Sequence, residues 1–154
     1  MYSLAICFYM LCVRIAALFN EKARLMTAGQ RNTWRVLARL GGKERYVWFH
    51  AASLGEFEQG RPLMERLRRE HPEKKILLTF FSPSGYEVRK NYKGADYIFY
   101  MPIDTPRNVR RFLDLAHPEI AIFVKYEFWI NYLTQLKRRG TRTFVISAIF
   151  RRNS

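Results

Sequence analysis

Residues 50–57, with the sequence HAASLGEF, place small side chains, a hydroxyl, a glycine and a carboxylate next to one another. Ser53 and Gly55 favour close approach of a ligand to the backbone, because glycine has no side chain and a helix start has unpaired N–H groups. Glu56 falls in the first turn of the expected helix. It is predicted either to stabilise the positive end of the helix dipole or to act as a general base in a cleft.

A second polar loop, with the sequence TFFSPSG, covers residues 79–85. Two hydroxyls, Ser82 and Ser84, stand with Gly85 just before a segment of helical character, so this loop could cradle an oxygen-rich or phosphate group. The same pattern is also compatible with Ser82 or Ser84 acting only as the N-cap of that helix.

Two further loops carry carboxylates. In the loop MPIDTP, Asp104 is expected to be a structural turn or cap residue, and Thr105 followed by Pro106 is typical of a helix start. In the loop KYEFW, Glu127 stands beside aromatic side chains. There it either binds sugar hydroxyls or forms an ion pair with Lys125.

Short apolar runs must position these loops. Five of them have the length and composition of buried strands, at residues 46–50, 75–80, 97–101, 120–124 and 143–147. Segments of helical periodicity separate them, and this alternation predicts an α/β fold with a Rossmann-like parallel sheet and helices on both faces. The four polar loops then follow the carboxyl ends of strands, which is the edge where such sheets bind ligands.

Several kinds of site are not supported by the sequence. There is no glycine-rich dinucleotide motif and no phosphate-loop lysine motif, so nucleotide binding by this part of a protein is disfavoured. The three histidines, His50, His71 and His117, lack metal-ligand spacing and are expected at the surface or at helix caps. Cys7 and Cys12 also lack such spacing, so no metal and no cofactor is expected, and a reducing compartment is favoured.

The N-terminus is apolar. Residues 2–19 contain only Ser3 and Arg14 as polar positions, and as a helix they would be about 27 Å long, close to the thickness of a bilayer core. Residues 1–20 are therefore predicted to span the membrane or lie on it, with a signal peptide or a core helix as weaker alternatives. The basic residues that follow favour a cytoplasmic location for the rest of the chain.

Residues 21–42 are expected to form a basic helix and linker, and residues 43–154 the α/β domain. The formal net charge of +14 would attract an anionic membrane surface, a phosphorylated substrate or a polyanion. Charge alone therefore leaves a second class open, a basic α/β module that binds nucleic acid.

The four loops, in this order, resemble the N-terminal domain of 3-deoxy-D-manno-octulosonic acid (Kdo) transferases. The resemblance runs from about Lys22 to the chain end, and it is carried by residues 50–57, 79–85, 102–104 and 127–129 with Asn131. It implies the N-terminal half of a GT-B glycosyltransferase on the cytoplasmic face of the inner membrane. This half would bind the lipid A precursor and an additional C-terminal domain would bind CMP-Kdo. The chain alone is therefore expected to be inactive, and nucleic acid is not expected as a partner.

The resemblance also implies roles for individual residues. Glu56 would be the general base, no metal would be needed, and the acceptor would contact Ser53, Gly55, Ser82, Ser84, Gly85 and Glu127. Arg89 and Arg107 are candidates for contacts with acceptor phosphates. The sequence departs from the family pattern at Lys125, where an acidic residue is usual, at Ile130, where proline is common, and in residues 147–151.

Overall fold

Five strands form one parallel sheet in the order β3-β2-β1-β4-β5. A computed structural model describes residues 2–125 and 129–146 of the chain. The strands are β1 (Tyr46–Ala51), β2 (Lys75–Phe80), β3 (Tyr97–Tyr100), β4 (Pro118–Val124) and β5 (Arg142–Ile146). The predicted fold class is confirmed, and the five predicted strands all exist, with ends that differ by at most two residues; position 147 lies outside the described residues.

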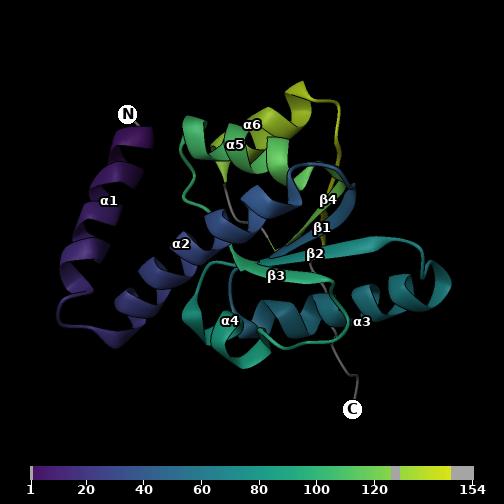
Figure 1. Ribbon diagram of the computed structural model, residues 1–154, viewed down its shortest axis with the longest axis horizontal. Helices are drawn as coiled ribbons and strands as arrows, with labels where there is room; N and C mark the ends of the chain where they lie inside the picture. Colours follow the sequence, from purple (N-terminus) through teal and green to yellow (C-terminus); the bar gives the residue numbers. More distant parts are fainter. Residues whose placement is uncertain (1, 126–128, 147–154) are drawn as a thin grey trace, which may run out of the picture.

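Helices cover both faces of this sheet (Figure 1). They are α1 (Tyr2–Ala16), α2 (Glu21–Leu40), α3 (Leu54–Glu70), α4 (Pro83–Arg89), α5 (Pro106–Ala116) and α6 (Ile130–Arg138). Helices α2, α5 and α6 pack on one face, and α3 and α4 pack on the other. Each sheet face therefore has its own apolar core.

Strand β1 lies in the centre of the sheet, and all six of its side chains are buried. Its residues alternate between the two faces, as the pleat of a strand requires. Trp48 packs on the α5 and α6 side, where its ring lies 5.0 Å from the ring of Phe112 and 5.5 Å from that of Tyr132. Phe49 packs on the α3 side. The loop that follows β1 therefore begins at a central strand whose side chains are all buried in the two cores.

Strand β5 lies at one edge of the sheet and is much more exposed than the others. It pairs with β4 along one side only among the described residues. The side chains of Phe144 and Val145 are 51% and 46% exposed. This edge is therefore both apolar and open.

The apolar N-terminus forms a helix shorter than the predicted anchor. Helix α1 ends at Ala16, and α2 starts after Asn20, whose side chain accepts a hydrogen bond from the Lys22 N–H at 2.9 Å. Among the described residues, none of the helices alone has both the length and the hydropathy of a membrane span; Leu4–Ala16 and Glu21–Leu40 reach them only as a pair bent by 117°. The membrane role of residues 1–20 stays a prediction.

Helix α1 packs back on the domain, on the side toward which the arrowhead of β3 points (Figure 1). Met10 of α1 is buried in a small cluster with Met26 of α2 and Tyr100 of β3. The Tyr2 hydroxyl donates a hydrogen bond to Asp104 at 2.6 Å. One side of α1 therefore belongs to the folded domain.

Asp104 is fully buried and joins three elements. Its carboxylate accepts hydrogen bonds from Tyr2 and from the N–H groups of Asn131 and Tyr132, at 3.3 and 3.2 Å, in the first turn of α6. The N-cap residue of α6, Trp129, makes no side-chain cap hydrogen bond, so Asp104 caps this helix from a remote loop. The cap role predicted for Asp104 is confirmed.

The helix start predicted at Thr105 and Pro106 is also confirmed. The Thr105 hydroxyl accepts a hydrogen bond from the Asn108 N–H at 3.4 Å, and Pro106 occupies the first position of α5. Asp104 and Thr105 therefore cap two different helices from adjacent positions in one loop.

Replacement of Asp104 by alanine is expected to lower the free energy of unfolding by about 2–4 kcal/mol, because buried donors lose a charged acceptor. Urea unfolding of the chain would measure this loss. Asp114→Ala is the matched control, since its ion pair with Arg139 is exposed and contributes at most about 1 kcal/mol. Equal losses for the two variants would contradict the capping role.

The loss of unfolding free energy caused by Asp104→Ala should also depend on pH. Burial raises the pKa of Asp104 above its ordinary value of 3.8, against the opposing effect of its hydrogen bonds. The folded state therefore binds the proton more tightly than the unfolded state, and the contribution of Asp104 falls as pH rises through the folded pKa. Unfolding at several pH values should show a smaller cost near pH 7 than near pH 4, and a cost that grows with pH would contradict this sign.

Candidate functional site

The loops that follow β1 and β2 are joined by their backbones. The Ser82 N–H donates a hydrogen bond to the Ala52 carbonyl at 2.8 Å. Strands β1 and β2 are paired in register up to Ala51 and Phe80, so both loops leave the sheet at the same level. The structure thus brings together two of the polar segments that the sequence placed at the carboxyl edge.

Glu56 is the third residue of α3, and its side chain folds back over the loop that precedes the helix. One carboxylate oxygen accepts a hydrogen bond from the Ala52 N–H at 2.6 Å. Since a carboxylate has two oxygens and about four acceptor sites, this bond fixes the group without using its full capacity. Glu56 is partly exposed and forms no ion pair with the described residues. Both roles considered for it, helix stabilisation and proton transfer, are compatible with this geometry.

Gly55 and Gly85 differ sharply in their surroundings. A Cβ atom built on Gly55 meets nothing within 4 Å, so packing of the described fold does not require a glycine there. A Cβ atom built on Gly85 would overlap the ring of Phe80 and lie 3.1 Å from the Ser53 carbonyl carbon. Gly85 is therefore needed for the close approach of α4 to the β1–α3 loop, whereas Gly55 faces open space.

The two hydroxyls of the second loop lie together. The Ser82 hydroxyl accepts a hydrogen bond from the Ser84 N–H at 3.3 Å, and the two side-chain oxygens are 3.0 Å apart. Ser82 is thus the N-cap of α4, as one of the two sequence interpretations predicted. Contact of Ser53, Ser82 or Ser84 with a ligand stays a prediction.

His50 lies beneath these loops, and the expectation of a surface or cap position was wrong for it. It is 1% exposed, and its Nδ1 atom is 2.9 Å from the Thr79 hydroxyl. The reason is that His50 is the penultimate residue of the central strand, whose two faces are both covered. His71 and His117 do cap α3 and α5 at the surface, as expected.

The remaining candidate residues are placed only in part. Glu127 lies outside the described residues. Arg89 is paired with Glu58 through a contact of 2.5 Å between Nη2 and Oε1, so it is already engaged in an ion pair. Arg107 is exposed in the first turn of α5. Asn131 donates a side-chain hydrogen bond to the Asp104 carbonyl at 2.7 Å, which links two of the segments that carry the resemblance.

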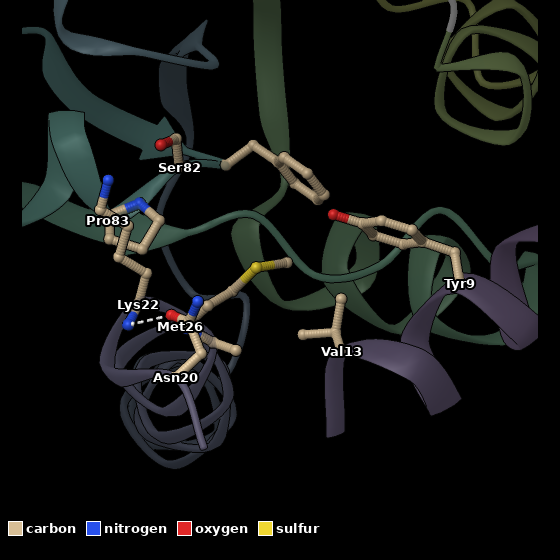
Figure 2. A pocket seen from close by; sticks show the side chains of 9 residues that line it. Tyr9, Val13, Asn20, Lys22, Met26, Ser82 and Pro83 are labelled. Carbon is tan, nitrogen blue, oxygen red and sulfur yellow. Dashed lines mark hydrogen bonds between the residues drawn. The ribbon is translucent and has the colours of Figure 1, made fainter. Parts of the chain in front are cut away.

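A cavity of about 270 Å³ adjoins the second loop. Figure 2 shows Tyr9 and Val13 of α1 on one side of it and Ser82 and Pro83 on the other, with Met26 of α2 between them. Hydropathy did not indicate this cavity, because it gives the length of the apolar N-terminus but not which of its faces contact the domain. Within residues 2–125 and 129–146, no three His, Cys, Asp or Glu side chains gather where they could hold a metal ion.

The family model described as 3-deoxy-D-manno-octulosonic-acid transferase (kdotransferase) matches residues 21–154. The chain belongs to this family. The expected architecture, a Rossmann-like N-terminal domain of GT-B type, is therefore confirmed together with the fold. Kdo transferases are membrane-associated, and the apolar N-terminus of this chain agrees with that property. Whether residues 1–20 span the bilayer or lie on it stays a prediction.

Curated Kdo transferases are similar to this chain over 84 to 109 residues. The protein of Haemophilus influenzae is 33% identical over 102 residues, which cover 66% of this chain and 24% of the relative. The protein of Aquifex aeolicus is 42% identical over 84 residues, covering 54% and 23%. That of Chlamydia trachomatis serovar D is 35% identical over 109 residues, covering 69% and 25%. The chain spans about a quarter of the length of these relatives.

Alanine substitutions at the two glycines should have opposite effects on stability. Gly55→Ala is expected to raise the free energy of unfolding by about 0.5–1 kcal/mol, because alanine favours the helix and meets no neighbour. Gly85→Ala should lower it by about 1–3 kcal/mol through overlap with Phe80. Thermal unfolding of both variants would measure the difference between them. A lower free energy of unfolding for Gly55→Ala would contradict the open surroundings of Gly55.

Proposed function

We propose that this chain is the acceptor-binding half of a Kdo transferase that transfers Kdo from CMP-Kdo to the lipid A precursor in lipopolysaccharide biosynthesis. The observation that carries this proposal is the family match over residues 21–154 together with the position of Glu56 at the carboxyl edge of the sheet. The donor would bind mainly to an additional C-terminal domain, because the matched residues cover only about a quarter of the length of the relatives. Residues 1–154 alone are therefore expected to be inactive.

In this proposal Glu56 is the general base. An acceptor hydroxyl attacks the anomeric carbon of Kdo, and a new bond forms between that oxygen and the carbon. The bond from the anomeric carbon to the phosphate oxygen of CMP breaks, and CMP leaves with the electron pair. The proton of the acceptor hydroxyl passes to the Glu56 carboxylate. The hydrogen bond from Ala52 supports this role, because it holds the carboxylate in one orientation before the substrate arrives.

The acceptor would lie over the two joined loops. Ser82 and Ser84 present adjacent hydroxyls, and Gly55 offers open space beside the backbone. Together with Ser53, Gly85 and Glu127, these residues are proposed to orient the sugar hydroxyls of the acceptor. Gly85 would act indirectly, since it allows the two loops to approach each other.

We further propose the cytoplasmic face of the inner membrane as the location. The net charge of +14 supports it, because anionic lipids and the phosphates of the acceptor both attract cations. The apolar residues of α1 support contact with the bilayer, whether they span it or lie in its interface. The donor-binding domain and the membrane are thus the partners expected for this domain.

Glu56→Gln is the direct test of the proposed chemistry. In a protein that carries this chain joined to a donor-binding domain, the substitution should lower kcat for Kdo transfer by about 100-fold or more, because glutamine cannot take the proton. Radiolabelled Kdo transferred to the lipid A precursor would give the rate, and thermal unfolding would show whether the fold is kept.

Glu58→Gln is the matched control, since it lies on the same helix and pairs with Arg89 at the surface. Its kcat should stay within about threefold of the parent value. Turnover near the parent rate in the Glu56 variant would exclude Glu56 as the base. No transfer by the parent protein would reject the proposed activity itself.

A further inference from the structure

The cavity beside Ser82 is one end of a longer groove. It shares Tyr9 and Phe81 with a second cavity of about 280 Å³. This second cavity shares Met10 and Ile103 with a third one of about 300 Å³. The three cavities therefore lie next to one another between α1 and the carboxyl edge of the sheet, and we call them together the α1 groove.

The middle of the α1 groove is apolar. Its walls are formed by Ile6, Tyr9, Met10, Phe81, Ile103 and Trp129, with Asp104 at one point. The Asp104 carboxylate is already used by Tyr2 and by the start of α6. A channel of this composition excludes charged groups and favours hydrocarbon.

A basic side chain lies at each end of this apolar section. Lys22 lines the end next to Ser82, on the same side of the cavity as Pro83 in Figure 2. Arg14 lines the opposite end. Neither side chain forms an ion pair with a described residue. An apolar channel with a cation at its mouth suits a hydrocarbon chain that ends in an anionic headgroup.

The Ser82 end of the groove leads to the candidate base. Ser82 lines the cavity and is hydrogen-bonded through its N–H to Ala52, which in turn donates to Glu56. A headgroup held at this end would therefore contact the loop that is linked through Ala52 to the proposed base.

The outer side of α1 is apolar as well. Leu4, Phe8 and Ile15 are 75%, 69% and 55% exposed, and they recur at the spacing of one helix face. This face suits contact with lipid, whereas Met10 faces the domain. Helix α1 thus has an exposed apolar face on its outer side and lines the α1 groove with its inner side.

We propose that the α1 groove holds one acyl chain of the lipid acceptor, with the phosphorylated headgroup at the end formed by Lys22 and Ser82. This proposal rests on the proposed function for the identity of the lipid. The groove would then fix the depth to which the acceptor is drawn out of the bilayer, and so place its hydroxyl at the sheet edge.

Photocrosslinking would test the groove. The probe is phosphatidic acid with a diazirine near the end of one acyl chain, presented to the 154-residue chain in phosphatidylcholine vesicles, with adducts located by mass spectrometry. Adducts are expected on groove residues such as Tyr9, Phe81 and Ile103. Adducts confined to the outer face of α1, at Leu4 and Phe8, would overturn the proposal in favour of simple membrane contact.

Variants that fill the channel sharpen the test. Ile6→Trp and Ile103→Trp narrow it from opposite walls and should each reduce groove adducts by about fivefold or more, equivalent to at least about 1 kcal/mol. Leu4→Trp adds the same ring on the exposed face of α1 and should leave them unchanged. Unchanged groove adducts in both tryptophan variants would refute the assignment. Two variants are used so that this conclusion still holds if one substitution displaces α1 instead of filling the groove.

Competition identifies the occupant. Unlabelled lipid A precursor should suppress the groove adducts more strongly than the same concentration of unlabelled phosphatidic acid. Equal suppression would reject the acceptor as the specific occupant. Glu56→Gln should leave the adducts intact, so a failure of the proposed catalysis and a failure of the groove would be seen in separate measurements.

Discussion

Ala52 holds the candidate site together through both of its backbone polar groups. Its N–H binds the Glu56 carboxylate and its carbonyl binds the Ser82 N–H. Ala52 contributes only backbone atoms to this link, so its position in the link depends on where the two parallel strands end. The relative position of the base and the serine loop is consequently set by the ends of two paired strands of the sheet.

The same principle extends to the other side of the site. Asp104 connects the β3–α5 loop with the start of α6 and with α1. Both connections use the buried Asp104 carboxylate, and a hydrogen bond to a buried charged group is stronger and its loss more costly. Loops that would otherwise be mobile are thereby held as one surface, as a site that orients a substrate requires.

Much of this arrangement could be predicted from the sequence. The strands follow from short apolar runs between polar loops, and the helix start at Thr105 follows from a cap residue before proline. The capping of α6 could not be predicted, because Asp104 is distant from it in the sequence and only the fold brings them together. The burial of His50 was missed because a polar side chain at a strand end does not reveal whether the face it enters is covered.

The sequence after α1 carries a signal for the start of a second helix. Asn20 before an acidic residue is typical of a helix start, and it divides the apolar stretch from the basic helix that follows. Hydropathy alone gives the length of an apolar segment, but it does not show which of its faces contact protein. For this reason the sequence predicted a membrane segment and gave no indication of the groove beneath it.

The open edge at β5 has a consequence for the behaviour of the chain in solution. Within the part of the chain that the structure describes, the outer edge of β5 has no strand partner, so its N–H and C=O groups next to Phe144 and Val145 offer a template on which a second copy can add a strand. The net charge of +14 opposes such self-association by mutual repulsion at low ionic strength. Added salt screens that repulsion and strengthens burial of apolar groups, so the isolated domain should be handled in dilute buffer.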